Sequence, residues 1–250
     1  MVKPNFKITA ADGKARAGVL SMQRHVLDTP TFMPVGTRGS VRTITSQDLE
    51  ELGADIILGN TYHLMLRPGE DLIQGFGGIH GFADWNRLIL TDSGGYQVFS
   101  LEPDVDDDGV EFKSTYDGSL HRLTPEIAVD IQCSLGADIQ MVLDVCPPIP
   151  AEKKVLEIAV ERTHKWAIRG RNHFLLREKS FENERAQFGI IQGGLDPKLR
   201  QISAEQIVEI GFDGYAIGGL SVGETRQEMI EPMQISADAL PNQQPRYFMG

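Results

Sequence analysis

The stretch RLILTDSGGYQ (87–97) joins a short apolar run to an acid and a glycine pair. Apolar runs of this length are typical of strands buried on both faces of a sheet. Similar runs recur along the chain, and most are followed by a helical pattern. They are TFMPVG (31–36), ADIILGN (54–60), RLILTD (87–92), ADIQMVLD (137–144), QFGIIQGG (187–194), GYAIGG (214–219) and RYFMG (246–250).

Amphipathic segments lie between these runs, at 46–53, 151–171 and 203–211. The first and the last begin with a serine, which suits a helix N-cap, and end at a glycine. Thr124-Pro125-Glu126 predicts another helix, with a capping hydroxyl before a proline at the first helical position. Strands alternating with helices predict an α/β fold with a parallel sheet.

Both a doubly wound sheet and a (β/α)8 barrel satisfy this alternation. Polar or glycine residues end nearly every run: Thr37, Asn60, Asp92, Asp144, Gln192 and Gly218-Gly219. A barrel brings all these ends to one rim, whereas a doubly wound sheet uses only those near its switch point. We therefore favour a (β/α)8 TIM barrel as a single domain over 1–250, with seven of its eight strands present.

Two hairpins interrupt the alternation. FKITA and ARAGVL flank Asp12-Gly13, a pair that tolerates the positive φ of a tight turn, and predict an N-terminal antiparallel hairpin. VEFKS (110–114) and SLHRL (119–123) predict a second hairpin around residues 116–118.

Composition excludes several classes of protein. The chain is 41% hydrophobic and 24% charged, which fits neither a disordered nor a fibrous protein. No apolar run approaches the roughly 18 residues that span a bilayer, and the first residues lack the apolar core of a signal peptide. Two cysteines cannot form a disulfide framework, so we expect a cytoplasmic protein.

The net charge of -11 is spread unevenly. Residues 1–150 hold 11 basic and 21 acidic side chains, whereas residues 151–250 hold 13 and 14. Six basic residues cluster at 162–179: Arg162, Lys165, Arg169, Arg171, Arg177 and Lys179. This cluster is either a solvated helix face or a patch that follows the phosphates of RNA.

The candidate functional side chains lie at the predicted rim. Asp92 ends a buried strand, where a carboxylate is costly unless it has a partner or a role. Asp144 precedes Cys146-Pro147-Pro148, which forms a stiff loop, and both acids could instead cap helices or form ion pairs. Glycine pairs follow Gln192 and Ile217. Two carboxylates, an amide and free backbone N–H groups predict a site for a planar, donor-rich heterocycle such as a purine.

Three other patterns give weaker evidence of function. Asp104, Asp106 and Asp108 copy the start of an EF-hand loop, but its twelfth position holds Thr115 instead of glutamate, so we favour an acidic solvated loop. The histidines and cysteines lack the local spacing of a metal site, so we expect residues 1–250 to hold no metal. No G-x-S-x-G is present to predict a hydrolase.

The ordered blocks TFMPVGT, LGNTYHLMLRPG, TDSGGYQVFSL, LTPE, VLD-V-C, IIQGG, IGGLSVGE and RYFMG resemble the bacterial tRNA-guanine transglycosylases, or queuine tRNA-ribosyltransferases. The resemblance covers essentially the whole chain. It implies a TIM barrel that exchanges the wobble guanine of tRNA for 7-aminomethyl-7-deazaguanine in queuosine biosynthesis. The implied reaction is a double displacement through a covalent aspartyl-ribosyl intermediate.

The resemblance also implies roles for single residues. Asp92 would be the general acid/base. Asp144 would accept the ring N–H and the exocyclic amine of guanine. Gln192 and the Gly219 N–H would donate to the base carbonyl.

Further roles concern the incoming base and the walls of the site. The Leu220 carbonyl would accept from the aminomethyl group, in an orientation held by Glu224. Cys146 and Val222 match the bacterial form of the pocket. Tyr96 and Met249 would stack on either face of the base. The other implied substrate-binding residues are Ser93, Gly94, Gly95 and Gly218.

The resemblance places the nucleophilic aspartate beyond Gly250, followed by a structural zinc subdomain that contributes to a homodimer. We therefore expect the 250 residues alone to be inactive and, because the runs at 31–36 and 246–250 would be open sheet edges, to self-associate. The alternative is a non-catalytic base- or RNA-binding subunit of such an enzyme.

Overall fold

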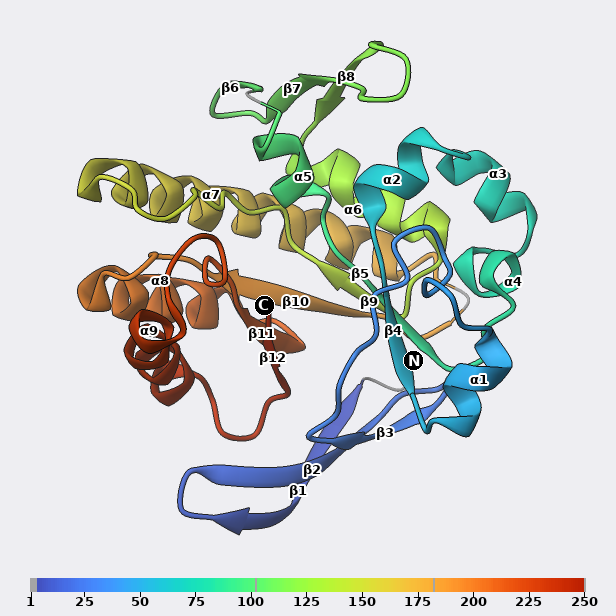
Figure 1. The fold of residues 1–250 in the computed structure, drawn as a ribbon, viewed down its shortest axis with the longest axis horizontal. Helices are drawn as coiled ribbons and strands as arrows, with labels where there is room; N and C mark the ends of the chain where they lie inside the picture. Colours follow the sequence, from blue (N-terminus) through green and yellow to red (C-terminus); the bar gives the residue numbers. More distant parts are fainter. Residues whose placement is uncertain (1–3, 102, 182, 250) are drawn as a thin grey trace.

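A computed structural model describes residues 4–101, 103–181 and 183–249. Its centre is a parallel sheet that curls through the molecule (Figure 1). The strands are β4 (Ile56–Gly59), β5 (Leu88–Thr91), β9 (Ile139–Met141), β10 (Ala186–Ile191), β11 (Gly214–Ile217) and β12 (Arg246–Phe248). Each pairs with the next in chain order. Val35 adds a parallel bridge to Leu58, so the predicted strand at 31–36 is reduced to one bridging residue.

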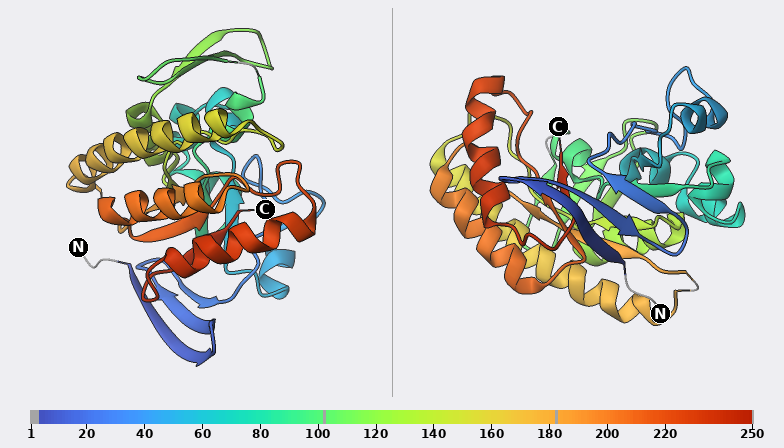
Figure 2. Two further views of the ribbon diagram at one scale, coloured as in Figure 1. Left: turned by 90° about the vertical axis from the view of Figure 1, so that its left-hand side faces the viewer. Right: turned by 90° about the horizontal axis from the view of Figure 1, so that it is seen from below.

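This strand order separates the two architectures that the sequence left open. A doubly wound sheet reverses its strand order at a switch point, whereas these strands follow the chain without reversal. Helices α7, α8 and α9 lie side by side along the outside of the curled sheet (Figure 2). The fold is therefore α/β with a curled parallel sheet, consistent with a partial TIM barrel.

Nine helices are described. They are α1 (Ser46–Glu51), α2 (Thr61–Leu66), α3 (Glu70–Gly75), α4 (Ile79–Ala83), α5 (Gly95–Phe99), α6 (Pro125–Leu135), α7 (Lys153–Glu178), α8 (Pro197–Ile210) and α9 (Arg226–Ala239). Thr124 caps α6 as predicted. The two predicted serine caps are wrong: Thr45 caps α1, and α8 begins earlier, after Asp196. In each case a better-placed oxygen accepts from the first backbone N–H groups.

The N-terminal hairpin forms and gains a third strand. β1 (Asn5–Asp12), β2 (Ala15–Ser21) and β3 (Val26–Thr29) make an antiparallel sheet. Asp12 pairs with Ala15, so the turn residues are Gly13 and Lys14 instead of Asp12 and Gly13. The β2–β3 turn lies against the start of the parallel strands, where Arg24 Nε donates to Asp138 Oδ1 at 3.0 Å.

The second predicted hairpin also forms. β7 (Val110–Lys113) pairs with β8 (Leu120–Leu123), and β6 (Asp104–Val105) extends the sheet by one short strand. This sheet stands apart from the parallel sheet, at the top of Figure 1. Tyr62 on α2 holds its tip, with 2.9 Å between the Tyr62 hydroxyl and Thr115 Oγ1.

Both faces of the parallel sheet are buried. On β4, Ile56 and Leu58 belong to one apolar cluster, while Ile57 belongs to another. Successive side chains of a strand point to opposite faces, and burial on both explains why these strands read as continuous apolar runs. No helix within the described ranges is long and apolar enough to cross a membrane.

Candidate functional site

A pocket of about 250 Å³ opens at the carboxyl ends of the parallel strands. Thirteen of the fourteen predicted site residues line it. They are Asp92, Ser93, Gly94, Gly95, Tyr96, Asp144, Cys146, Gln192, Gly218, Gly219, Leu220, Val222 and Met249. Glu224 stands outside the lining. Four other lining residues were not predicted from the sequence: Leu58, Gln97, Ser221 and Tyr247.

Asp92 is held from three sides. Its Oδ2 accepts from Asn60 Nδ2 at 2.6 Å, and its Oδ1 accepts from the backbone N–H groups of Thr61 at 2.9 Å and Gly94 at 3.0 Å. Gly94 has a φ of +81°, and a Cβ there would lie 3.2 Å from the Tyr62 nitrogen. This close approach brings the Gly94 N–H to the carboxylate and favours glycine.

These hydrogen bonds only partly offset the burial of Asp92. Desolvation raises its pKa to about 7, with a smaller increase from the nearby Asp144 charge and decreases from the Thr61, Gly94 and Asn60 hydrogen bonds. A carboxyl group with a pKa near neutrality can both release and accept a proton there.

Asp144 lines the same pocket, after the strand that pairs with β5. Its Oδ2 accepts from Gln192 Nε2 at 2.6 Å, and both side chains are almost completely buried. Burial raises the pKa of Asp144 to about 6, while the Gln192 hydrogen bond lowers it. Gln192 has a second amide hydrogen, and each carboxylate oxygen has two lone pairs. The pair can therefore still present both donors and acceptors to a ligand.

Two further lining residues stay neutral. Burial raises the pKa of the Cys146 thiol to about 12, and the Asp144 charge adds to the increase. Burial also raises the pKa of Tyr247 to about 12, with a contribution from Asp92. Neither group is therefore a nucleophile or a base near neutral pH.

Glu224 shapes the pocket from behind. Its Oε1 accepts from the Ser221 N–H and its Oε2 accepts from the Val222 N–H at 3.0 Å. Ser221 has a φ of +60°, an uncommon conformation for a side-chain-bearing residue. Glu224 therefore stabilises the turn that follows Leu220, although it does not itself reach the pocket surface.

Arg200 on α8 is a site-forming residue that the sequence analysis missed. Its side chain is fully buried, and it donates to backbone carbonyls at the ends of β10 and β11. The signal was available: α8 buries Leu199, Ser203, Ala204 and Ile207, so the i, i+3, i+4, i+7 pattern places an arginine on the apolar face.

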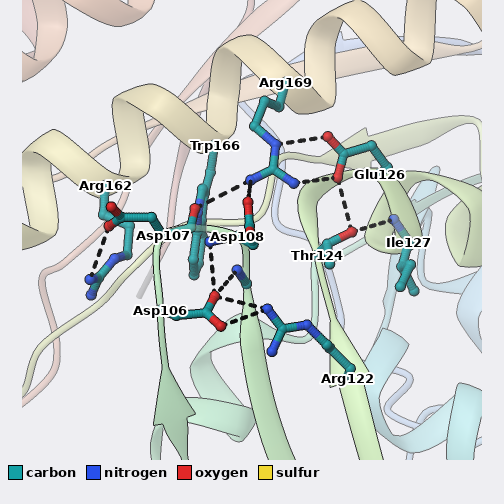
Figure 3. Close-up of polar contacts among 11 residues, drawn as sticks. Asp106, Asp107, Asp108, Arg122, Thr124, Glu126, Ile127, Arg162, Trp166 and Arg169 are labelled. Carbon is teal, nitrogen blue, oxygen red and sulfur yellow. Dashed lines mark hydrogen bonds and ion pairs between the residues drawn. The ribbon is translucent and has the colours of Figure 1, made fainter.

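Five of the six basic residues at 162–179 are paired with carboxylates, which favours a structural role for this cluster over contact with RNA phosphates. Arg169 makes two 2.8 Å hydrogen bonds to Glu126, and Arg162 lies 3.7 Å from Asp107 (Figure 3). The other pairs are Lys165–Glu161, Arg171–Asp213 and Arg177–Asp130.

The acidic residues at 104–108, which copy the start of an EF-hand loop, are also partly paired with basic side chains. Asp106 accepts two 2.8 Å hydrogen bonds from Arg122 Nη2, and Asp108 lies 3.7 Å from Arg169 (Figure 3). Asp106 thus pairs within the hairpin sheet, whereas Asp107 and Asp108 join that sheet to α7. Within the described ranges, no group of three or more histidine, cysteine or acidic side chains is arranged to hold a metal ion.

The chain is similar in sequence to known proteins of one family. The sequence model of the family described as queuine tRNA-ribosyltransferase matches residues 12–250. The queuine tRNA-ribosyltransferase of Thermotoga neapolitana is 52% identical over 98% of this chain and 65% of its own length. That of Zymomonas mobilis is 50% identical over 98% of this chain and 64% of its own.

The chain thus spans about 65% of the length of the first of these curated relatives. With Sphingopyxis alaskensis, identity is 50% over the entire chain and 67% of the relative. The match extends through every strand of the parallel sheet and through the whole pocket lining. This chain belongs to the queuine tRNA-ribosyltransferase family.

Proposed function

We propose that this protein is a tRNA-guanine transglycosylase, which exchanges the wobble guanine of tRNA for 7-aminomethyl-7-deazaguanine in queuosine biosynthesis. The observation that carries the proposal is that the Asp144–Gln192 pair and Asp92 line one pocket. It supplies acceptors and donors for the edge of a purine, and a separate carboxyl group for proton transfer.

Base recognition follows from the polar groups in the pocket. Asp144 accepts from the ring N–H and the exocyclic amine of guanine. The second amide hydrogen of Gln192 and the N–H of Gly219 donate to the base carbonyl. Tyr96 and Met249 stack on the two faces, an arrangement that proteins commonly use for a base removed from its helix. This pattern matches guanine and rejects adenine, whose amine would meet these donors.

The 7-substituent is recognised next to the base. The Leu220 carbonyl accepts from the aminomethyl group, and Glu224 fixes the turn that follows. Cys146 and Val222 leave room for a small substituent but not for the bulkier queuine.

The reaction is two displacements at the ribose. An aspartate oxygen attacks C1′, the bond from C1′ to guanine N9 breaks, and guanine takes the electron pair and a proton. The incoming base then loses a proton, its ring nitrogen attacks C1′, and the aspartate is released. Asp92 moves these protons and lies beside the ribose. The resemblance places the nucleophile outside the residues described here, so we assign no nucleophile among them.

The remaining proposals concern the complete enzyme. An eighth strand would close the TIM barrel, and a structural zinc subdomain would support a homodimer in the cytoplasm. The residues of this chain do not fit that zinc site: Cys146 lies in the pocket, and Cys133 is buried on α6, where Gln140 donates to its sulfur. No step of the reaction depends on that metal.

The rival is a non-catalytic base- or RNA-binding subunit. The complete lining and the raised pKa of Asp92 favour the enzyme, because a binding subunit needs no proton-transfer group. The test uses a version extended to the length of the curated relatives, incubated with labelled guanine and a substrate tRNA. Incorporation of label into tRNA supports the enzyme. Base binding without incorporation supports the rival.

A further inference from the structure

Arg200 contacts the pocket from behind, entirely through backbone carbonyls. Its Nε donates to the Gly194 carbonyl at 2.7 Å, its Nη1 to the Gly218 carbonyl at 2.6 Å, and its Nη2 to the Gly219 carbonyl at 2.9 Å. A longer contact of 3.3 Å reaches the Ile191 carbonyl. One side chain therefore fixes both glycine pairs at the rim.

The guanidinium is a buried charge without an ion-pair partner. Among the described residues, no carboxylate lies within ion-pair distance of Arg200. Burial lowers its pKa to about 10, which still leaves it charged at neutral pH. A buried charge is costly to keep, and if the loops needed packing alone, a neutral side chain could supply it.

The Gly218–Gly219 peptide connects this charge to the pocket. The Gly218 carbonyl and the Gly219 N–H belong to the same planar amide. Arg200 donates to the carbonyl end, and a hydrogen bond at one end of an amide polarises the other end. Gly219 and Cys146 both line the pocket, and hydrogen bonding from the Gly219 N–H lowers the pKa of the Cys146 thiol.

The approach of the amide to Gln192 is close enough to require glycine. Gly219 has a φ of +64°, and a Cβ there would lie 2.2 Å from Gln192 Oε1. The Arg200 Nη2 would lie 3.5 Å from the same Cβ. The buried charge, the polarised amide and the Gln192 side chain therefore meet at one wall of the pocket.

We propose that Arg200 is a positioning and specificity-determining residue, whose charge polarises the Gly218–Gly219 amide so that this wall selects purines carrying a strong carbonyl acceptor. The inference rests on the proposed function, because it takes a guanine-type base as the ligand. It adds the source of the selectivity: a charge that never touches the base strengthens the donor that does.

The experiment measures ligand preference in this chain by calorimetry, with guanine and 6-thioguanine as the probes. The two bases share their ring N–H and exocyclic amine, but sulfur is a much weaker acceptor than oxygen. The variants are Arg200→Gln, which removes the charge, and Arg200→Lys, which keeps it. Arg171→Gln is the matched control, since Arg171 is also buried and donates to the Gly211 carbonyl and to Asp213, away from the pocket.

We expect Arg200→Gln to lose about tenfold in guanine affinity but only about twofold in 6-thioguanine affinity, as expected for a weakened charge-assisted donor. Arg200→Lys should retain most of the preference for guanine over 6-thioguanine. Arg171→Gln should lower the melting temperature but leave this preference unchanged. Equal losses for both bases in Arg200→Gln would mean that Arg200 only packs the loops, and would overturn the inference. An unchanged guanine affinity would overturn it too.

A second measurement does not depend on any variant folding. Isotope-edited infrared spectra of guanine bound to the native chain should show the base carbonyl stretch at lower frequency than in water. A carbonyl frequency equal to that in water would contradict a polarised donor. If guanine does not bind the native chain at all, the proposed function fails; if it binds without the Arg200 dependence, only this inference fails.

Discussion

Gln192 Nε2 donates to Asp144 Oδ2 at 2.6 Å, so an amide from the loop after β10 and an acid from the loop after β9 form one buried unit. Asp92 lines the same pocket, and its own hydrogen bonds are to Asn60, Thr61 and Gly94 and not to that unit. Recognition and proton transfer are thus assigned to different carboxyl groups. Each can be perturbed separately.

The first prediction concerns pH. The pKa of Asp144 in the free pocket is raised to about 6, and the donors of a bound guanine would stabilise the carboxylate and lower that pKa. Binding below pH 6 therefore releases a proton, and affinity should fall by up to about tenfold for each pH unit below that value. Calorimetry between pH 8 and pH 5 measures it.

Asp144→Asn is the control for this pH dependence. Its residual guanine affinity should be nearly flat across the range, apart from any contribution of Asp92, whose pKa is about 7. A native affinity that is constant from pH 8 to pH 5 would show that the Asp144 carboxylate is not the acceptor.

The second prediction separates turnover from binding at Asp92. In a version extended to the length of the relatives, Asp92→Asn should slow base exchange by about 10²–10⁴-fold. Base affinity should change far less, because the acceptors for the base are on Asp144. If exchange and affinity fall together, Asp92 is a binding residue and the assignment is wrong.

A substitution of Asn60 tests the same role of Asp92 without changing Asp92 itself. Its 2.6 Å hydrogen bond favours the ionised form of Asp92, so Asn60→Ala should raise the Asp92 pKa further. The pH–rate profile of the extended version should then shift to higher pH. Because Asn60 also caps α2, a stability loss of about 1 kcal/mol should accompany the shift. A lower melting temperature with an unchanged pH–rate profile would mean that Asn60 only caps α2 and does not influence the Asp92 pKa.

The third prediction concerns the 7-substituent. Glu224→Gln replaces one of the two carboxylate oxygens that accept from Ser221 and Val222 with an amide nitrogen, which loosens the turn after Leu220. Affinity for 7-aminomethyl-7-deazaguanine should fall by several-fold, about 1 kcal/mol, while guanine affinity stays the same. Competition calorimetry with both bases decides. Equal losses for the two bases would argue against a role in recognising the aminomethyl group.

The fourth prediction concerns the cluster at 162–179. Arg169→Gln should lower the free energy of unfolding by about 1 kcal/mol, because it breaks a two-point contact to Glu126 near the surface. The affinity of the chain for tRNA should not change. A marked loss of tRNA affinity with unchanged stability would restore the RNA-phosphate interpretation.

The sequence predicted the parallel strands because burial on both faces leaves apolar runs that are easy to recognise, as at 87–92. It predicted the rim residues because polar side chains at strand ends are conspicuous. The short helices α2, α3 and α4 were missed, since tertiary contacts stabilise helices of this length more than local propensity does.

The structure also shows what local patterns could not decide. In the sequence, the charges at 162–179 form a basic patch. In the structure, β6 and the loop after it bring Asp107 and Asp108 beside α7, where they pair with Arg162 and Arg169. The apolar face of α8 marks Arg200 as an unusual residue, but its partners are backbone carbonyls at the ends of β10 and β11, which leave no side-chain signature in the sequence.

The most direct test of the central claim is a titration of the native chain and of Asp144→Asn with 7-aminomethyl-7-deazaguanine. Asp238→Asn, at an exposed ion pair with Lys14, is the matched control. We predict one site on the native chain, an unchanged affinity in Asp238→Asn and a loss of more than about tenfold in Asp144→Asn, because a buried donor edge is left without its acceptor. Equal affinity in the native chain and in Asp144→Asn, or no binding to the native chain, would contradict the assignment of this pocket.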